Sequence, residues 1–145
     1  MPLSPRLAAI VDALPITPHM RVLEIGCGPG AAARAVAARL DGGHVVAIDR
    51  SATAVSQARA GGAAEIATGR LTVRQVAAED FALEPGEAPF DIVFAVRVGA
   101  LDGRHPEAGR RAWARIAAAL APGGRVFVDG REVATPSGRA QSVPK

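Results

Sequence analysis

Residues 21–31 read Arg-Val-Leu-Glu-Ile-Gly-Cys-Gly-Pro-Gly-Ala, and they set the architecture expected for the rest of the 145-residue chain. Apolar Val22, Leu23 and Ile25 predict a buried strand, and the alternating glycines predict a tight turn directly after it. An alanine-rich helix is expected to begin at about Ala31. Missing Cβ atoms let a ligand approach the backbone of such a turn, and unpaired N–H groups at the helix start point toward it. The stretch therefore predicts a nucleotide-binding turn.

Glu24 is the unusual residue of this stretch, because it puts a carboxylate inside an otherwise apolar strand. Burying a charge is costly unless a positive or hydrogen-bonding group meets it. Two interpretations are open at this point: Glu24 meets a positively charged group of a ligand, or it has a structural role, capping a loop or pairing with an arginine.

The composition indicates one globular domain, with 49% hydrophobic and 21% charged residues. The net charge is only +3 and the arginines are scattered, which argues against a nucleic-acid partner. The single cysteine, Cys27, excludes an intramolecular disulfide and a cysteine-cluster metal site, and we expect no metal. No apolar run approaches the roughly 18 residues of a membrane span, and residues 1–5 do not resemble a signal peptide. We therefore expect a cytoplasmic protein without a membrane partner.

Helix and strand patterns alternate along the chain, which predicts an α/β fold. The predicted helices cover 4–14, 31–40, 52–60 and 107–121, and the predicted strands cover 21–25, 44–49, 70–76, 90–96 and 125–129. Right-handed crossovers between these strands give a Rossmann-like doubly wound sheet of about five parallel strands, with helices on both faces. We expect one domain over residues 1–130 and a polar tail over 131–145. A ligand is expected at the carboxyl ends of the strands.

The glycine turn fits two nucleotide patterns, G-x-G-x-x-A for dinucleotides and G-x-G-x-G. Asp49 lies about 20 residues further on, where both patterns place a ribose-binding acid. Glu24 separates them, since a carboxylate repels a dinucleotide pyrophosphate and attracts a ligand that carries an ammonium group and a sulfonium.

Four segments resemble motifs of the class I S-adenosylmethionine (SAM)-dependent methyltransferases, and together they span residues from about 5 to 130. The segments are Val22–Gly30, Val46–Ser51, Phe90–Ala95 and Leu120–Val126. The last contains the family's L-x-P-G-G-x turn. Their order and spacing also match the family, which makes the resemblance specific.

The resemblance implies a SAM site in which the glycine backbone wraps the methionine moiety, Glu24 holds its ammonium group and Asp49 accepts both ribose hydroxyls. Residues 78–80 would meet the adenine, and Val96 and Arg97 would lie beside the methyl group. The predicted cofactor-binding residues are Glu24, Gly26, Cys27, Gly28, Gly30, Asp49, Arg50, Ala78, Glu79, Asp80 and Val96.

The catalytic residue is not identified by the sequence, and the candidates are Arg97, Asp102 and His105, which follow the fourth predicted strand. Structural alternatives stay open for two of them: Arg97 as a surface arginine, and His105 as a loop residue that caps the next helix. We interpret three arginines of the next predicted helix as a solvated helix face: Arg110, Arg111 and Arg115.

The sequence departs from the family pattern at two places. Ala77 stands where the family often has the acid that binds the adenine amine. Residues 131–145 contain no hydrophobic run able to supply the two further strands with which the family's sheet typically ends. The fifth strand would then be an exposed edge, and such an edge favours a homodimer or another partner.

The resemblance implies methyl transfer from SAM to a small-molecule acceptor. Such a displacement needs alignment and exclusion of water, and a base only when the acceptor has a proton to lose. A degenerate or regulatory SAM-binding subunit without transfer activity is the alternative, because the adenine acid and terminal strands are missing. An NAD-binding oxidoreductase is the third hypothesis, against which Glu24 and the Pro-Gly-Gly turn argue.

Overall fold

The structure, a computed structural model, describes residues 3–134, in which helices and strands alternate as the sequence predicts. The elements are α1 (Pro5–Ala13), β1 (Arg21–Ile25), α2 (Ala31–Ala37), β2 (His44–Asp49), α3 (Ala52–Gly61), α4 (Ala63–Ala67), β3 (Leu71–Gln75), the 3₁₀ helix η1 (Ala78–Asp80), β4 (Phe90–Ala95), α5 (Pro106–Ala119), β5 (Leu120–Val128) and β6 (Arg131–Val133).

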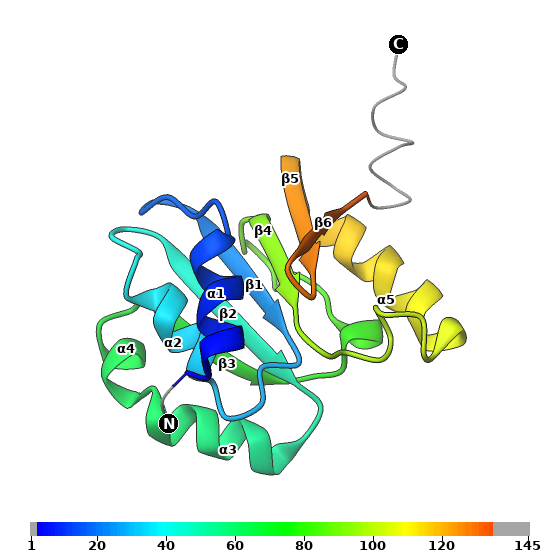
Figure 1. Ribbon diagram of the computed structural model, residues 1–145. Coiled ribbons are helices and arrows are strands. Elements are labelled where there is room, and N and C mark those ends of the chain that lie inside the picture. Colours follow the sequence, from blue (N-terminus) through cyan, green and yellow to red (C-terminus); the bar gives the residue numbers. More distant parts are fainter. Residues whose placement is uncertain (1–2, 135–145) are drawn as a thin grey trace.

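The strands form one sheet in the order β3-β2-β1-β4-β5-β6. The first five are parallel, and β6 runs antiparallel to β5. Helices α1, α2 and α3 lie on one side of the sheet and α5 lies on the other (Figure 1). This arrangement confirms the predicted Rossmann-like fold and makes the neighbours β1 and β4 the point where the strand order reverses. None of the helices within residues 3–134 is long and apolar enough to cross a membrane.

Local capping explains where two of the helices begin. The Ser4 hydroxyl accepts a hydrogen bond from the Leu7 N–H at 3.1 Å, with Pro5 in the first turn of α1. The Ser51 hydroxyl accepts one from the Ala54 N–H at 3.1 Å and starts α3 in the same way. Serine is a preferred N-cap residue, so both helix starts follow from the local sequence.

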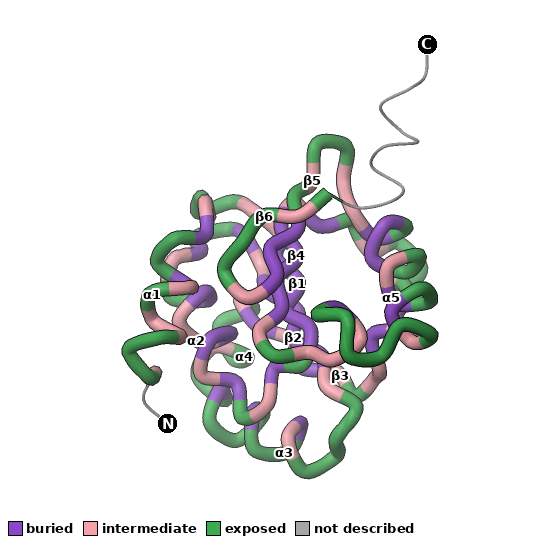
Figure 2. The backbone as a smooth tube through the Cα atoms, turned by 45° about the vertical axis from the view of Figure 1, so that its right-hand side comes forward, coloured by how far each residue is buried: buried purple, intermediate pink, exposed green. Residues whose placement is uncertain are grey.

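The central strands are buried between two apolar layers (Figure 2). Side chains alternate between the faces of a strand, so Val22 packs in the layer under α1 and α2 while Leu23 and Ile25 pack toward α5. Glu24 is on the same face as Val22, below the start of α2. This placement brings a carboxylate to the inner side of the glycine turn.

The largest differences from the prediction are at α2, α4 and β5. Helix α2 ends at Ala37 instead of residue 40, and the short helix α4, which was not predicted, directly follows the end of α3 at Gly61. Strand β5 begins at Leu120, because Phe90 pairs with Leu120 before the ladder shifts at a bulge. The Pro-Gly-Gly turn therefore interrupts a longer strand, which a search for continuous apolar residues does not detect.

The prediction of a loose tail from residue 131 onward is wrong for its first residues, since Arg131–Val133 form β6. They pair with Val126–Val128 through a tight turn at Asp129-Gly130, where φ is 51° and 86°. An Asp-Gly pair between two strands is a strong hairpin signal. The edge of β5 that was expected to be open is thus covered over Val126–Val128, and the short strand β6 forms the edge of the sheet there, which weakens that argument for a homodimer. The dimer itself stays a prediction. Residues 135–145 of the predicted tail lie outside the described residues.

Candidate functional site

A pocket of about 750 Å³ opens at the carboxyl ends of the strands. It is lined by the segments that follow β1, β2, β3 and β4 and by the start of α5. The lining residues are Ile25, Gly26, Asp49, Arg50, Val76, Ala77, Ala78, Glu79, Arg97, Val98, Gly99, Ala100, Arg104, His105, Pro106, Glu107, Ala108 and Arg111. The pocket therefore lies where a doubly wound sheet binds its ligands.

The glycine turn depends on the missing side chains at two positions. Gly26 has φ +69°, and a Cβ there would lie 2.6 Å from Val98 Cγ2, so only glycine lets the loop after β4 rest on the turn. Gly30 precedes α2 with φ +91°, and a Cβ would lie 3.0 Å from the Ala58 Cβ. The turn is therefore held between two other parts of the chain, and its first glycine, Gly26, lines the pocket.

Asp49 is fixed at the end of β2 by two backbone hydrogen bonds. Its Oδ2 accepts the N–H of Gly28 at 2.9 Å, and its Oδ1 accepts the N–H of Ser51 at 2.9 Å. Each carboxylate oxygen has a second lone pair, so Asp49 still has capacity to accept two donors from a ligand. Asp49 thereby links the glycine turn to β2 while facing the pocket.

Glu24 is the only charged or polar side chain among residues 3–134 that is fully buried, with 4% of its surface exposed. Its Oε1 has no hydrogen-bond partner, and no described arginine pairs with it. Burial, and secondarily the negative charge of Asp49, raises the pKa of Glu24 from 4.5 to about 8, while the Ala33 N–H offsets part of this effect. A buried acid with an unpartnered oxygen is rare in folded proteins, and here it fits a site that receives a positively charged ligand group.

Cys27 packs against the layer under α2 with 6% of its surface exposed, outside the pocket lining. Burial, followed by the charges of Glu24 and Asp49, raises the pKa of its thiol to about 12. The side chain therefore stays protonated at neutral pH and is not an activated nucleophile.

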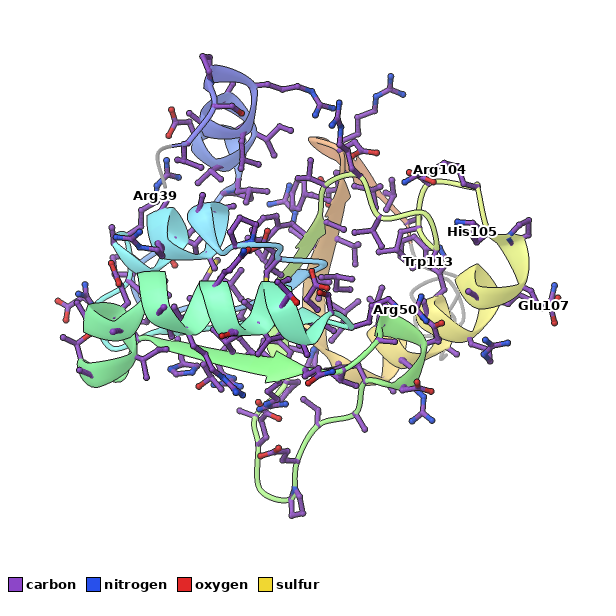
Figure 3. All side chains as sticks on the ribbon, turned by 90° about the horizontal axis from the view of Figure 1, so that it is seen from below. Arg39, Arg50, Arg104, His105, Glu107 and Trp113 are labelled. Atoms are coloured by element: carbon purple, nitrogen blue, oxygen red, sulfur yellow. The ribbon has the colours of Figure 1, made fainter. Side chains whose placement is uncertain are left out.

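Two of the three catalytic candidates line the pocket. Arg97 follows β4 in the left-handed conformation, with φ 59°, and its N–H donates to Asp129 Oδ1 at 2.8 Å. His105 occupies the N-cap position of α5 without a side-chain capping bond, and its ring packs on Gly99. Arg104 and His105 lie on the loop before α5, whereas Arg50 comes from the segment after β2 (Figure 3).

Asp102 is the third candidate, and it is outside the pocket lining. Both of its oxygens accept from Arg104 Nε, at 3.0 and 2.9 Å. This hydrogen bond from Arg104 lowers the pKa of Asp102, so the side chain is an ion-pair partner and a poor proton acceptor. Asp102 acts on the pocket only through the position of Arg104.

The predicted cofactor residues divide into three groups. Five line the pocket: Gly26, Asp49, Arg50, Ala78 and Glu79. Four form the turn and the layer behind it: Glu24, Cys27, Gly28 and Gly30. The structure does not bring the remaining two to the pocket. Asp80 is exposed and lines a separate cavity beside Arg59 and Arg74, because the 3₁₀ turn rotates it away from Glu79; Val96 packs in the layer under α1–α3.

Arg111 is a pocket residue that the sequence analysis missed, since it was interpreted as part of a solvated helix face. It lies one helical turn after Glu107 and Ala108, which also line the pocket. The order of the elements along the chain could have indicated this position of Arg111. A helix that follows β4 begins at the carboxyl edge of the sheet, so its first turns border the ligand site.

A sequence model described as a methyltransferase domain matches residues 22–124, which is most of the chain and includes three of the four motifs and most of the fourth. The chain belongs to this methyltransferase family. The resemblance predicted from the motifs is thereby confirmed.

Individual relatives show the same likeness. The chain is 36% identical over 122 residues to a protein-L-isoaspartate O-methyltransferase of Methylorubrum populi, covering 84% of this chain and 50% of that protein. It is 33% identical over 118 residues to a trans-aconitate 2-methyltransferase of Paracidovorax citrulli, covering 77% and 38%. The chain thus spans half or less of each relative's length.

A solved structure with the same fold is the SAM-dependent methyltransferase of Geobacter sulfurreducens in complex with S-adenosyl-L-homocysteine. Its TM-score is 0.66 at 23% identity, covering 88% of this chain and 48% of that one. At this level of identity the likeness shows the fold.

Proposed function

We propose that this chain forms the cofactor-binding core of a SAM-dependent methyltransferase that acts on a small-molecule acceptor. The observation that carries the proposal is the buried, unpartnered carboxyl group of Glu24 behind the glycine turn. A positive ligand group near that turn would stabilise the ionised form of Glu24, which burial disfavours, and the α-ammonium of SAM is such a group. The proposal also draws on the family membership of the chain.

Each residue of the cofactor side has a role in this proposal. Asp49 would accept the ribose hydroxyls with its remaining lone pairs, and the backbone of Gly26–Gly30 would pack along the methionine moiety. Ala78 and Glu79 would border the adenine, with Glu79 taking the place of the acid that the family often has at position 77. When bound, SAM supplies a methyl group that is already activated for transfer.

The protein's own contribution is then alignment and exclusion of water. Arg97 and His105 border the acceptor side of the pocket, and His105 would take a proton from an acceptor that has one to lose. We assign Asp102 a positioning role, because it lies outside the pocket lining and holds Arg104 through both of its oxygens. The names of the two relatives point to different acceptors, so the acceptor must be argued from this chain's own pocket.

Calorimetric titration with SAM, with S-adenosylhomocysteine and with NAD tests the proposal. Both adenosyl ligands are expected to bind and NAD is not, because Glu24 offers no positive charge to a pyrophosphate and its ionised form repels one. Asp49→Asn should weaken binding of SAM at least tenfold, since a neutral amide offers one acceptor oxygen in place of two. Glu24→Gln should also weaken it, because the amide cannot lose a proton and become the negative partner of the ammonium.

Asp41→Asn is the matched control, because Asp41 is exposed just before the amino end of the same strand, β2. Its affinity for SAM should equal that of the wild type. Selective binding of NAD would overturn the proposal in favour of the oxidoreductase alternative. Tight binding of SAM without formation of S-adenosylhomocysteine across a broad acceptor panel would support the alternative of a binding subunit.

A further inference from the structure

The charges of the pocket are unevenly distributed between its two sides. On the side of β2 and β3, the charged lining residues are the acids Asp49 and Glu79 and one arginine, Arg50. On the side of β4 and α5, they are Arg97, Arg104 and Arg111 and one acid, Glu107. The β4–α5 side therefore carries an excess of positive charge and suits an anion.

Two of the three arginines on this side of the pocket, Arg97 and Arg111, are exposed and have no charged partner, unlike Arg104. Seven of the arginines in residues 3–134 form ion pairs: Arg21, Arg34, Arg39, Arg74, Arg104, Arg110 and Arg125. Neither Arg97 nor Arg111 makes a side-chain hydrogen bond or an ion pair to any described residue. Carboxylates nearby are already engaged, because Asp102 pairs with Arg104 and Glu107 pairs with Arg110. Two guanidinium groups are thus left uncompensated on one wall of a pocket.

The backbone at Arg97 gives a second, independent observation. Its φ of 59° is a conformation that non-glycine residues seldom adopt, and such strain gathers at functional sites. The Asp129 carboxylate holds this conformation by accepting the Arg97 N–H at 2.8 Å, and Arg104 Nη2 donates to the Arg97 carbonyl at 3.3 Å. Surrounding groups therefore fix the backbone of Arg97 and leave its guanidinium unbound.

We infer that the acceptor of this methyltransferase carries an oxyanion, a carboxylate or a phosphate, held by Arg97 and Arg111. This inference rests on the proposed function and names the substrate class of the same site. The planar guanidinium groups present paired N–H donors that match the two oxygens of a carboxylate or phosphate. Binding the oxyanion on the α5 side would leave the rest of the acceptor directed toward the glycine turn, where the methyl donor is proposed to bind.

The test is calorimetry on the protein saturated with S-adenosylhomocysteine, in a buffer free of phosphate and sulfate. The probes are tricarballylate and phenyl phosphate, and the neutral triamide of tricarballylic acid is the matched uncharged compound. At least one of the two anions should bind at least tenfold more tightly than the triamide. Which of them does so distinguishes a carboxylate acceptor from a phosphate acceptor.

Arg97→Gln and Arg111→Gln should each weaken binding of the preferred anion about tenfold. Both variants should keep the wild-type affinity for S-adenosylhomocysteine, which also shows that they fold. Arg115→Gln is the control, because Arg115 lies on the same helix, is exposed and is outside the pocket lining. It should bind the anion like the wild type.

The inference is overturned if S-adenosylhomocysteine binds but neither anion is preferred over the triamide, and this result leaves the proposed function intact. An equal loss of anion binding in Arg115→Gln also overturns it, because the effect would then be one of general charge. Failure of S-adenosylhomocysteine to bind the wild type is a different result, which removes the proposed function first and this inference with it.

Discussion

The two ends of the sheet differ in whether their charged side chains have partners. At the amino ends of the strands, Glu87 accepts from Arg21 at 3.0 Å and from Arg74 at 2.6 Å, and Asp91 accepts the Arg21 N–H at 2.9 Å. At the carboxyl ends, the Oε1 of Glu24 has no partner, and Arg97 has none for its guanidinium. The charges at the first end pair with one another and stabilise the fold, whereas at the second end Glu24 and Arg97 are left without a partner in the described residues and are available to a ligand.

The largest effect that tests this comparison is the pH dependence caused by Glu24. The unfolded chain loses this proton near pH 4.5, whereas the folded protein keeps it up to about pH 8. The contribution of Glu24 to the free energy of unfolding should therefore be highest below pH 4.5 and fall by about 5 kcal/mol as the pH rises to 8. Urea unfolding at a series of pH values measures it.

Glu24→Gln should remove this slope, because the amide does not titrate, and the variant should be more stable than the wild type at pH 8. Glu84→Gln is the control, since Glu84 is exposed and should leave the slope unchanged. The prediction is contradicted if the free energy of unfolding of the wild type does not change over this pH range, or if the Glu24→Gln variant keeps the slope. Either result would show that burial does not raise the pKa of Glu24.

Glu87→Ala probes the opposite end and should lower the free energy of unfolding by about 2 kcal/mol, because it leaves two arginines without their shared partner. Although burial alone would raise the pKa of Glu87, the hydrogen bond from Arg74 and the nearby charges lower it. The contribution of Glu87 is therefore present above its unfolded pKa and lost as the pH falls through its folded value, opposite in sign to that of Glu24.

The same unfolding measurement, combined with SAM titration, separates the roles of the two ends. Glu87→Ala should bind SAM like the wild type, since the residue is remote from the pocket. Glu132→Ala breaks the exposed pair with Arg125 and should not measurably change stability. Weakened SAM binding in Glu87→Ala would contradict the division of the sheet into a structural end and a ligand end.

The smallest expected effect concerns the strained backbone after β4. Arg97→Gly should raise the free energy of unfolding by roughly 0.5–1 kcal/mol, because glycine adopts the positive φ without strain. Arg115→Gly, in the interior of α5, should instead lower it by about 1 kcal/mol. A lower stability for Arg97→Gly in thermal or urea unfolding would show that the side chain of Arg97 stabilises the fold.

Much of the fold was predictable because its signals are local. The apolar runs, the glycine turn and the serine caps each specify an element within a few residues, and strand–helix alternation then specifies the parallel sheet. Asp49 and Gly26 were found for the same reason, since the carboxyl ends of strands in such a sheet meet at one edge. The β6 hairpin also has a local sequence signal, the Asp129-Gly130 pair. It was missed because the residues after this pair are polar and contain no apolar run that predicts a strand.

The features that sequence reasoning missed depend on side-chain direction. Residues 79 and 80 are neighbours in sequence, yet the 3₁₀ turn at η1 directs only Glu79 to the pocket. Asp102 looks like a candidate base until its pairing with Arg104 is known. Arg111 and Arg115 are one turn apart on the same helix, but only Arg111 is close enough to the sheet edge to line the pocket.

The loop between β4 and α5 closes on itself at its base. Arg104 Nη2 donates to the Arg97 carbonyl at 3.3 Å, and the His105 N–H donates to the Gly99 carbonyl at 3.1 Å. The two ends of the loop are therefore neighbours, so a segment of another length can be spliced between them without displacing either flanking element. For protein engineering, the residues between Gly99 and His105 are therefore the part of this loop to exchange, because Val98, which packs on Gly26 of the glycine turn, stays outside the exchanged segment.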